Sequence, residues 1–186
     1  MVSIASLWLP ILLSSIAVFA ASSIIHMALK YHAADYKKLP DEEKITAAIR
    51  AAGVTPGTYH FPHCPDHKQM RTPEHMEKLK TGPIGLMTII PSGSPNMGKY
   101  LACWFVYSLA IGVFVAYLAG RTLAPGTPYL QVFRIAGTVA FLCYGMAHSH
   151  ASIWEGKAWS ITFRFYLDAL IYGCLTAGFF GWLWPK

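Results

Sequence analysis

The densest group of potential metal ligands lies in one short polar tract with the spacing His-x-x-His-Cys-x-x-His. It consists of three imidazoles and a thiol, from His60, His63, Cys64 and His67. Imidazole nitrogen and thiolate sulfur are donors that suit zinc and copper. The spacing matches no established zinc finger, and Pro62 and Pro65 prevent the regular helix that would align the donors. A zinc or copper site in this tract is therefore an alternative to an ordinary polar loop.

The remaining histidines are predicted on the same side of the membrane as this tract. His26 ends the first apolar run, and His148 and His150 end the third, so an even number of crossings places them together. They extend the set of candidate metal ligands. His148 and His150 are two residues apart, so on a helix they point to nearly opposite sides. We therefore expect at most one of these two to face the other helices.

Asp168 is the one acidic residue inside an apolar run. A charge within a membrane helix is a functional hypothesis by default. Arg164 lies one helical turn earlier and predicts a polar pair with Asp168. Because no second buried acid accompanies Asp168, the sequence favours this structural pair over the alternative, a proton or small-solute carrier centred on Asp168.

Sequence signatures of catalysis are missing from the chain. It contains no His-Glu-x-x-His, no Gly-x-Ser-x-Gly and no phosphate-binding glycine loop. Cys64 beside His63 is weak support for a thiol nucleophile, since catalytic partners meet in space rather than in sequence. The sequence favours a non-enzymatic role.

Composition indicates the kind of fold that must position these residues. The chain has 186 residues, 54% hydrophobic and only 13% charged, whereas soluble domains carry about a quarter charged residues. Four apolar runs, at 7–29, 101–119, 132–149 and 165–184, are each close to the ~20 residues that cross a bilayer as a helix. We expect an all-α membrane protein with four transmembrane helices in a bundle and a small α+β polar insert between the first two.

This pattern divides the chain into a first transmembrane helix at 1–29, a polar insert at 30–100 and three further helices at 101–186. The first run is expected to stay uncleaved, because no Lys or Arg precedes it. Basic residues are more numerous on the insert side. The positive-inside rule then predicts a multi-pass protein of the cell (inner) membrane, with a cytoplasmic insert and both termini outside.

The insert contains signals for short elements of its own. Acidic residues at 41–43 followed by a glycine at 53 predict a short amphipathic helix. Thr72 and Pro73 predict the start of a second helix, which runs to Lys80. The β-prone run from Ile84 to Ile90 is expected to pair with 58–61, although one hairpin is marginal unless it packs on something.

Small residues recur every fourth position in the second and fourth apolar runs, including Gly112, Gly173 and Gly181. Such rows let helix backbones approach closely in lipid. We expect these glycines at helix–helix contacts, where they could also serve a homo-oligomer or a membrane-protein partner. The formal charge of +6 comes from basic residues flanking apolar runs, so the expected partner is the lipid bilayer, not nucleic acid.

The whole chain resembles an uncharacterised group of bacterial four-helix integral membrane proteins. Four motifs carry the resemblance: Pro56-Gly57-Thr58-Tyr59, Asn96-Met97-Gly98-Lys99, Leu123-Ala124-Pro125-Gly126 and the ending Phe180-Gly181-Trp182-Leu183-Trp184-Pro185. The resemblance implies a bacterial origin and no activity. The sequence thus favours an accessory or structural membrane protein, with zinc or copper handling as the first alternative and a carrier as the second.

Overall fold

The computed structural model describes residues 1–66 and 68–186 and divides into two compact units. Residues 1–35 and 96–186 form the first, here called the membrane unit. Residues 36–95 form the second, here called the insert. The fold is mostly helical, with one small sheet, which agrees with the predicted class.

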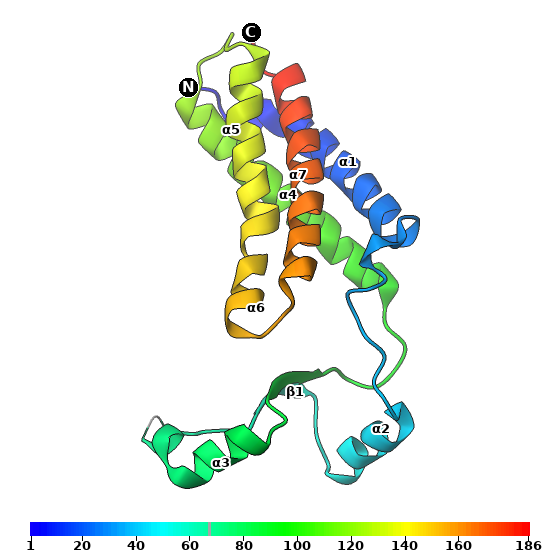
Figure 1. The fold of residues 1–186 in the computed structure, drawn as a ribbon. Helices are drawn as coiled ribbons and strands as arrows, with labels where there is room; N and C mark the ends of the chain where they lie inside the picture. The colour runs from blue at the N-terminus through cyan, green and yellow to red at the C-terminus, as the bar shows by residue number, and fades with distance from the viewer. Residues whose placement is uncertain (67) are drawn as a thin grey trace. The chain divides into compact units, whose positions relative to one another are not determined.

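The membrane unit is built from long helices (Figure 1). They are α1 (Trp8–Met27), α4 (Met97–Thr122), α5 (Tyr129–Phe141) and α7 (Trp159–Trp182). A π-helical turn (Leu142–Met146) joins α5 to the short α6 (His148–Trp154). Within the described chain, three stretches are long and apolar enough to cross a membrane: Ala5–Met27, Met97–Thr122 and Tyr129–Trp154.

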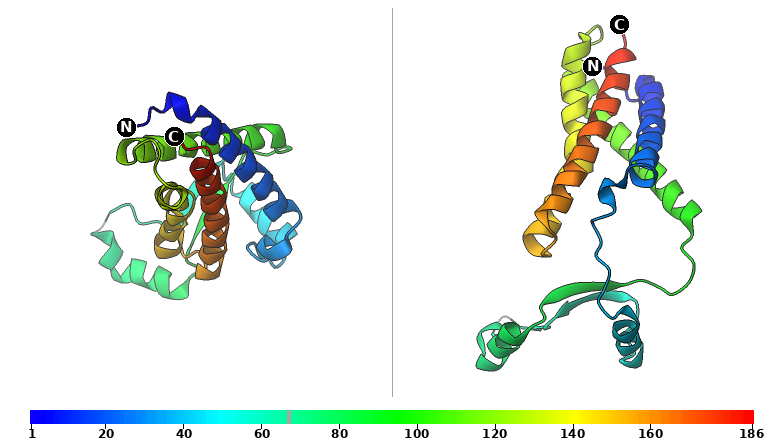
Figure 2. Two further views of the ribbon diagram at one scale, coloured as in Figure 1. Left: turned by 90° about the horizontal axis from the view of Figure 1, so that it is seen from above. Right: turned by 45° about the vertical axis from the view of Figure 1, so that its right-hand side comes forward.

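The fourth predicted run corresponds to α7, which has 24 residues. Its first half carries Arg164 and Asp168 and is less apolar than the second half. It packs along α5 and against α1, and α1 packs against α4. Figure 2 shows this arrangement from two further directions, with both chain termini at the same end of the membrane unit.

Glycines lie where these helices approach most closely, which confirms the prediction for Gly112, Gly173 and Gly181. A Cβ at Gly112 would be 3.1 Å from the Ile11 side chain, and one at Gly173 would be 3.2 Å from the Gly137 carbonyl oxygen. A Cβ at Gly181 would meet the Tyr129 ring at 2.7 Å. These glycines thus lie at contacts within the chain.

The insert contains α2 (Glu42–Ala51), α3 (Pro73–Thr81) and two strands, β1 (Gly57–Phe61) and β2 (Gly85–Ile89). The strands form the predicted antiparallel hairpin, with Tyr59 opposite Met87. Thr72 caps α3, and its hydroxyl accepts the His75 backbone N–H at 3.3 Å. The two expected helices and the expected hairpin are therefore confirmed.

The compact insert is shorter than the predicted segment 30–100 at both ends. Helix α4 begins at Met97, after the Asn96 side chain accepts the Lys99 N–H at 3.0 Å. Residues 30–35 belong to the membrane unit. The reason is a set of polar contacts between this segment and α7, which sequence periodicity does not reveal.

Candidate functional site

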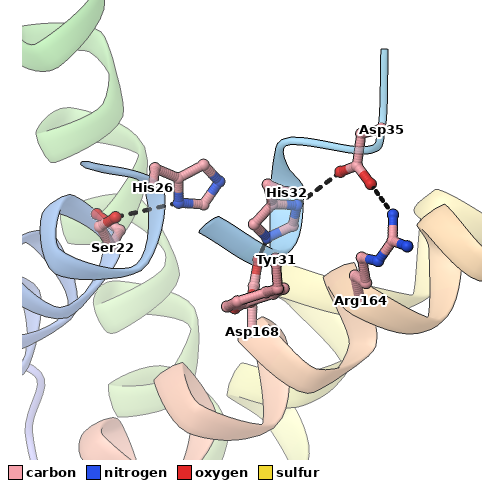
Figure 3. A network of polar contacts seen from close by, with 7 residues as sticks. All are labelled: Ser22, His26, Tyr31, His32, Asp35, Arg164 and Asp168. Carbon is pink, nitrogen blue, oxygen red and sulfur yellow. Dashed lines mark hydrogen bonds and ion pairs between the residues drawn. The ribbon is translucent and has the colours of Figure 1, made fainter. Parts of the chain in front are cut away.

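The main polar cluster of the membrane unit forms where the segment after α1 meets α7 (Figure 3). We call residues 28–35 the strap. Its 3-10 turn, η2 (Lys30–His32), lies against α7. Arg164 and Asp168 are one turn apart on α7, so they share one face of that helix. The strap cluster consists of five side chains: Tyr31, His32, Asp35, Arg164 and Asp168.

His32 joins the two carboxylates of the strap cluster. Its Nδ1 is 2.6 Å from Oδ2 of Asp35, and its Nε2 is 2.8 Å from Oδ2 of Asp168. An ionised carboxylate only accepts hydrogen bonds. Both bonds exist together when both ring nitrogens carry a proton, or when one carboxyl group holds the proton instead. The imidazole therefore fixes the strap to α7.

The second oxygen of each carboxylate also has a donor. The Arg164 guanidinium donates to Oδ1 of Asp35, and the Tyr31 hydroxyl donates to Oδ1 of Asp168. The Asp35 side chain is 3% exposed, and Asp168 is 2% exposed. Buried charges are costly unless they are paired and hydrogen-bonded. In this cluster every carboxylate oxygen meets that requirement.

Two side chains of the strap, Asp35 and Tyr31, have shifted pKa values. Burial alone would raise the pKa of the Asp35 carboxyl, but hydrogen bonds from His32 and Arg164 outweigh burial and hold that pKa below its usual value. Burial and the hydrogen bond to Asp168 raise the pKa of the Tyr31 hydroxyl. Tyr31 therefore stays a proton donor at neutral pH, and Asp35 stays an anion.

The strap cluster lies toward the end of the apolar helices that is opposite the chain termini. Fourteen residues separate Asp168 from Trp182, the last residue of α7, which is about 21 Å at ~1.5 Å per residue. The 20 residues of α1 span about 30 Å on the same scale. Asp168 therefore lies about three-fifths of the way along α7 from its carboxyl end, and Arg164 lies one turn nearer its start.

The predicted pair of Arg164 with Asp168 is corrected by the structure. Arg164 binds Asp35, and Asp168 binds His32 and Tyr31. The strap supplies a nearer carboxylate for the guanidinium, and Asp168 has its own two donors. Sequence reasoning missed Tyr31, His32 and Asp35. The sequence did contain a signal for this cluster: a tyrosine hydroxyl, an imidazole and a carboxylate lie within five residues, directly after an apolar run.

The predicted tract in the insert does not form a ligand group among its described members. Nδ1 of His60 is 3.2 Å from the Pro62 carbonyl oxygen, and Sγ of Cys64 is 3.1 Å from the Asp66 carbonyl oxygen. His63 joins no group of three potential ligands in residues 1–66 and 68–186. His67 lies outside the described residues.

The histidines at the helix ends have separate environments. His148 stacks on the Phe165 ring, with centroids 4.2 Å apart, and exposed His150 is 3.9 Å from the Glu155 carboxylate. His26 is 3.0 Å through Nδ1 from the Ser22 carbonyl oxygen, and its ring stacks on His32. Across the described chain, one group of three potential ligands lies close enough to share an ion: His26, His32 and Asp168.

No family model, curated protein or solved structure matches the chain. The function of the chain is therefore inferred from the geometry of the strap cluster and of the insert.

Proposed function

We propose that the chain is an integral membrane protein with four crossings and a non-enzymatic accessory role, in which the insert is presented to a partner beside the bilayer. The length of α7 and its packing along α5 and α1 support a fourth crossing. The polar residues in its first turns then lie at the membrane boundary, where Arg164 and Asp168 are tolerated because they are paired.

One observation carries the accessory role: none of the described residues in the insert is buried. The hairpin has an alternating pattern in which Tyr59, Phe61, Met87 and Ile89 are only half-buried. A two-stranded hairpin without a covered face is marginally stable in water. The insert therefore has strands and helices but lacks the core that would hold them, which favours a unit that is completed by another protein.

The strap cluster gives this role a mechanical basis. The strap is the last part of the membrane unit before the insert begins at Tyr36. Because His32 and Asp35 bind α7, the insert starts from a fixed point on the membrane unit. An excess of Lys and Arg on the insert side supports a cytoplasmic insert and outside termini in the cell (inner) membrane.

The carrier alternative has less support from the geometry. Both oxygens of Asp168 are occupied, by His32 and by Tyr31. In the absence of an ion, this acid completes the network that holds the strap to α7. A structural role for Asp168 is therefore the better proposal.

Hydrogen exchange tests the accessory role. In purified full-length protein, amides of 57–61 and 85–89 should exchange quickly, because the hairpin lacks a covered face. In native membranes, where the partner is present, the same amides should exchange at least about tenfold more slowly. Helix α4 serves as the internal reference. Strong protection of the hairpin in purified protein, or no difference between the two preparations, would contradict the proposal.

A further inference from the structure

We propose that His26, His32 and Asp168 form a binding site for one divalent first-row transition-metal ion, with zinc as the best fit. This site goes beyond the accessory role and does not depend on it. None of its ligands belongs to the His60–Cys64 tract, because they come from the end of α1, from the strap and from α7.

The potential ligand atoms of His26, His32 and Asp168 converge on one place. One ligand atom from each of the three residues lies within 4.8 Å of the other two. Nitrogen and oxygen ligands bind zinc at about 2.0–2.2 Å in tetrahedral geometry, so two such ligands on one ion are about 3.3 Å apart. Nε2 of His32 and Oδ2 of Asp168, now 2.8 Å apart, must separate by only about 0.5 Å.

Each of the two histidine ligands is also held by a hydrogen-bond partner. Metal-binding histidines usually donate their other ring N–H to a carbonyl or a carboxylate, which fixes the ring and its tautomer. Nδ1 of His26 is 3.0 Å from the Ser22 carbonyl oxygen, and Nδ1 of His32 is 2.6 Å from the Asp35 carboxylate. With Nδ1 carrying a proton in each ring, an ion would bind at Nε2 and take the place of the proton between Nε2 of His32 and Oδ2 of Asp168, and that proton would leave to solvent.

The supporting contacts extend one step further. The guanidinium of Arg164 holds the Asp35 carboxylate, and the Tyr31 hydroxyl holds the Asp168 oxygen that does not face His32. All three ligands therefore have a partner that orients them, which is the arrangement that supports metal affinity. A protein-only ion-pair network would account for Asp35, His32 and Asp168 but would assign no role to His26.

The trio is accessible from solvent through His26. His26 is exposed, and its ring is stacked on His32 with centroids 4.6 Å apart. An ion can therefore reach the trio from the exposed side of His26, whereas Asp168 stays buried. Two imidazoles and one carboxylate suit zinc and similar divalent ions, and the absence of a thiolate from this trio disfavours Cu(I).

Zinc titration of the purified full-length protein in detergent, competed against a chromophoric chelator, tests the site. We expect one zinc per chain. His26→Ala should weaken zinc binding at least about tenfold, and the zinc-free variant should still melt in one cooperative transition, because the His26 ring is exposed. The matched control is His150→Ala, which removes another exposed imidazole and should leave zinc binding unchanged. Equal affinity in the parent and in His26→Ala would overturn the proposal.

Cobalt(II) spectroscopy separates this site from the insert tract. Bound Co²⁺ should show visible ligand-field bands without an intense near-ultraviolet thiolate band, and the spectrum should persist in Cys64→Ser. A thiolate band that disappears in Cys64→Ser would move the metal to the insert and overturn the assignment. These results are independent of the hairpin exchange that tests the accessory role, so either proposal can fail alone.

Discussion

Asp35→Asn should release the strap from α7 without unfolding the membrane unit. Asp35 accepts one bond from His32 and one from Arg164, and hydrogen bonds to charged groups contribute about 1.5–3 kcal/mol each. Asparagine keeps one acceptor oxygen, and the Arg164 side chain is 30% exposed, so solvent reduces the loss. We therefore expect the strap to become easier to open by about 1.5–2 kcal/mol.

Hydrogen exchange of the peptide that covers residues 28–36 measures this opening directly. Each 1.4 kcal/mol corresponds to a factor of ten, so exchange in Asp35→Asn should be about 10–30 times faster than in the parent. Glu155→Gln is the matched control, because its carboxylate is exposed and 3.9 Å from His150. Strap exchange that stays within about twofold of the parent in Asp35→Asn, or rises equally in the control, would refute the role given to the strap cluster.

Three further predictions concern pH, packing and topology. The pKa of Asp35 in the folded protein lies below its unfolded value of ~3.9. The contribution of Asp35 to strap protection should therefore be complete above pH ~4 and lost as the pH falls through the folded pKa. A pH titration of hydrogen exchange in the strap should show this step, and Asp35→Asn should abolish it. Gly173→Leu should lower the melting temperature. The control Gly178→Leu should not, because a Cβ at Gly178 meets only the Tyr129 hydroxyl, at 3.9 Å. Equal melting temperatures of the two variants would contradict the helix packing described above. Cys64 should react with a membrane-impermeant thiol reagent only after cells are permeabilised, and labelling of a single-cysteine variant in intact cells would reverse the orientation.

Local signals in the sequence predicted most of the secondary structure. Acidic residues before Ile45 and the Thr72-Pro73 pair mark two helix starts, and both depend on contacts a few residues apart. Long apolar runs predicted the helices of the membrane unit, because the bilayer imposes their length. Rows of small residues predicted the close approaches at Gly112 and Gly173, which also repeat at fixed spacing.

The candidate site could not be predicted in the same way. His32 and Asp168 are 136 residues apart in sequence, and no periodic pattern connects a short turn with a distant helix. The dense tract at His60–His67 attracted attention because its ligands are adjacent in sequence. The potential ligands that meet in space, His26, His32 and Asp168, come instead from three separate elements. Of these, the sequence singled out His26 and Asp168 but not His32.

The binding of the strap to α7 is tested most directly by a double-mutant cycle on strap exchange with His32→Ala and Asp168→Asn. If the two side chains bind each other as the 2.8 Å contact indicates, their effects on the opening free energy should be coupled by about 1 kcal/mol or more. The double variant should then open little more readily than the more damaging single variant. Effects that add within about 0.5 kcal/mol would contradict a direct bond between the strap and α7.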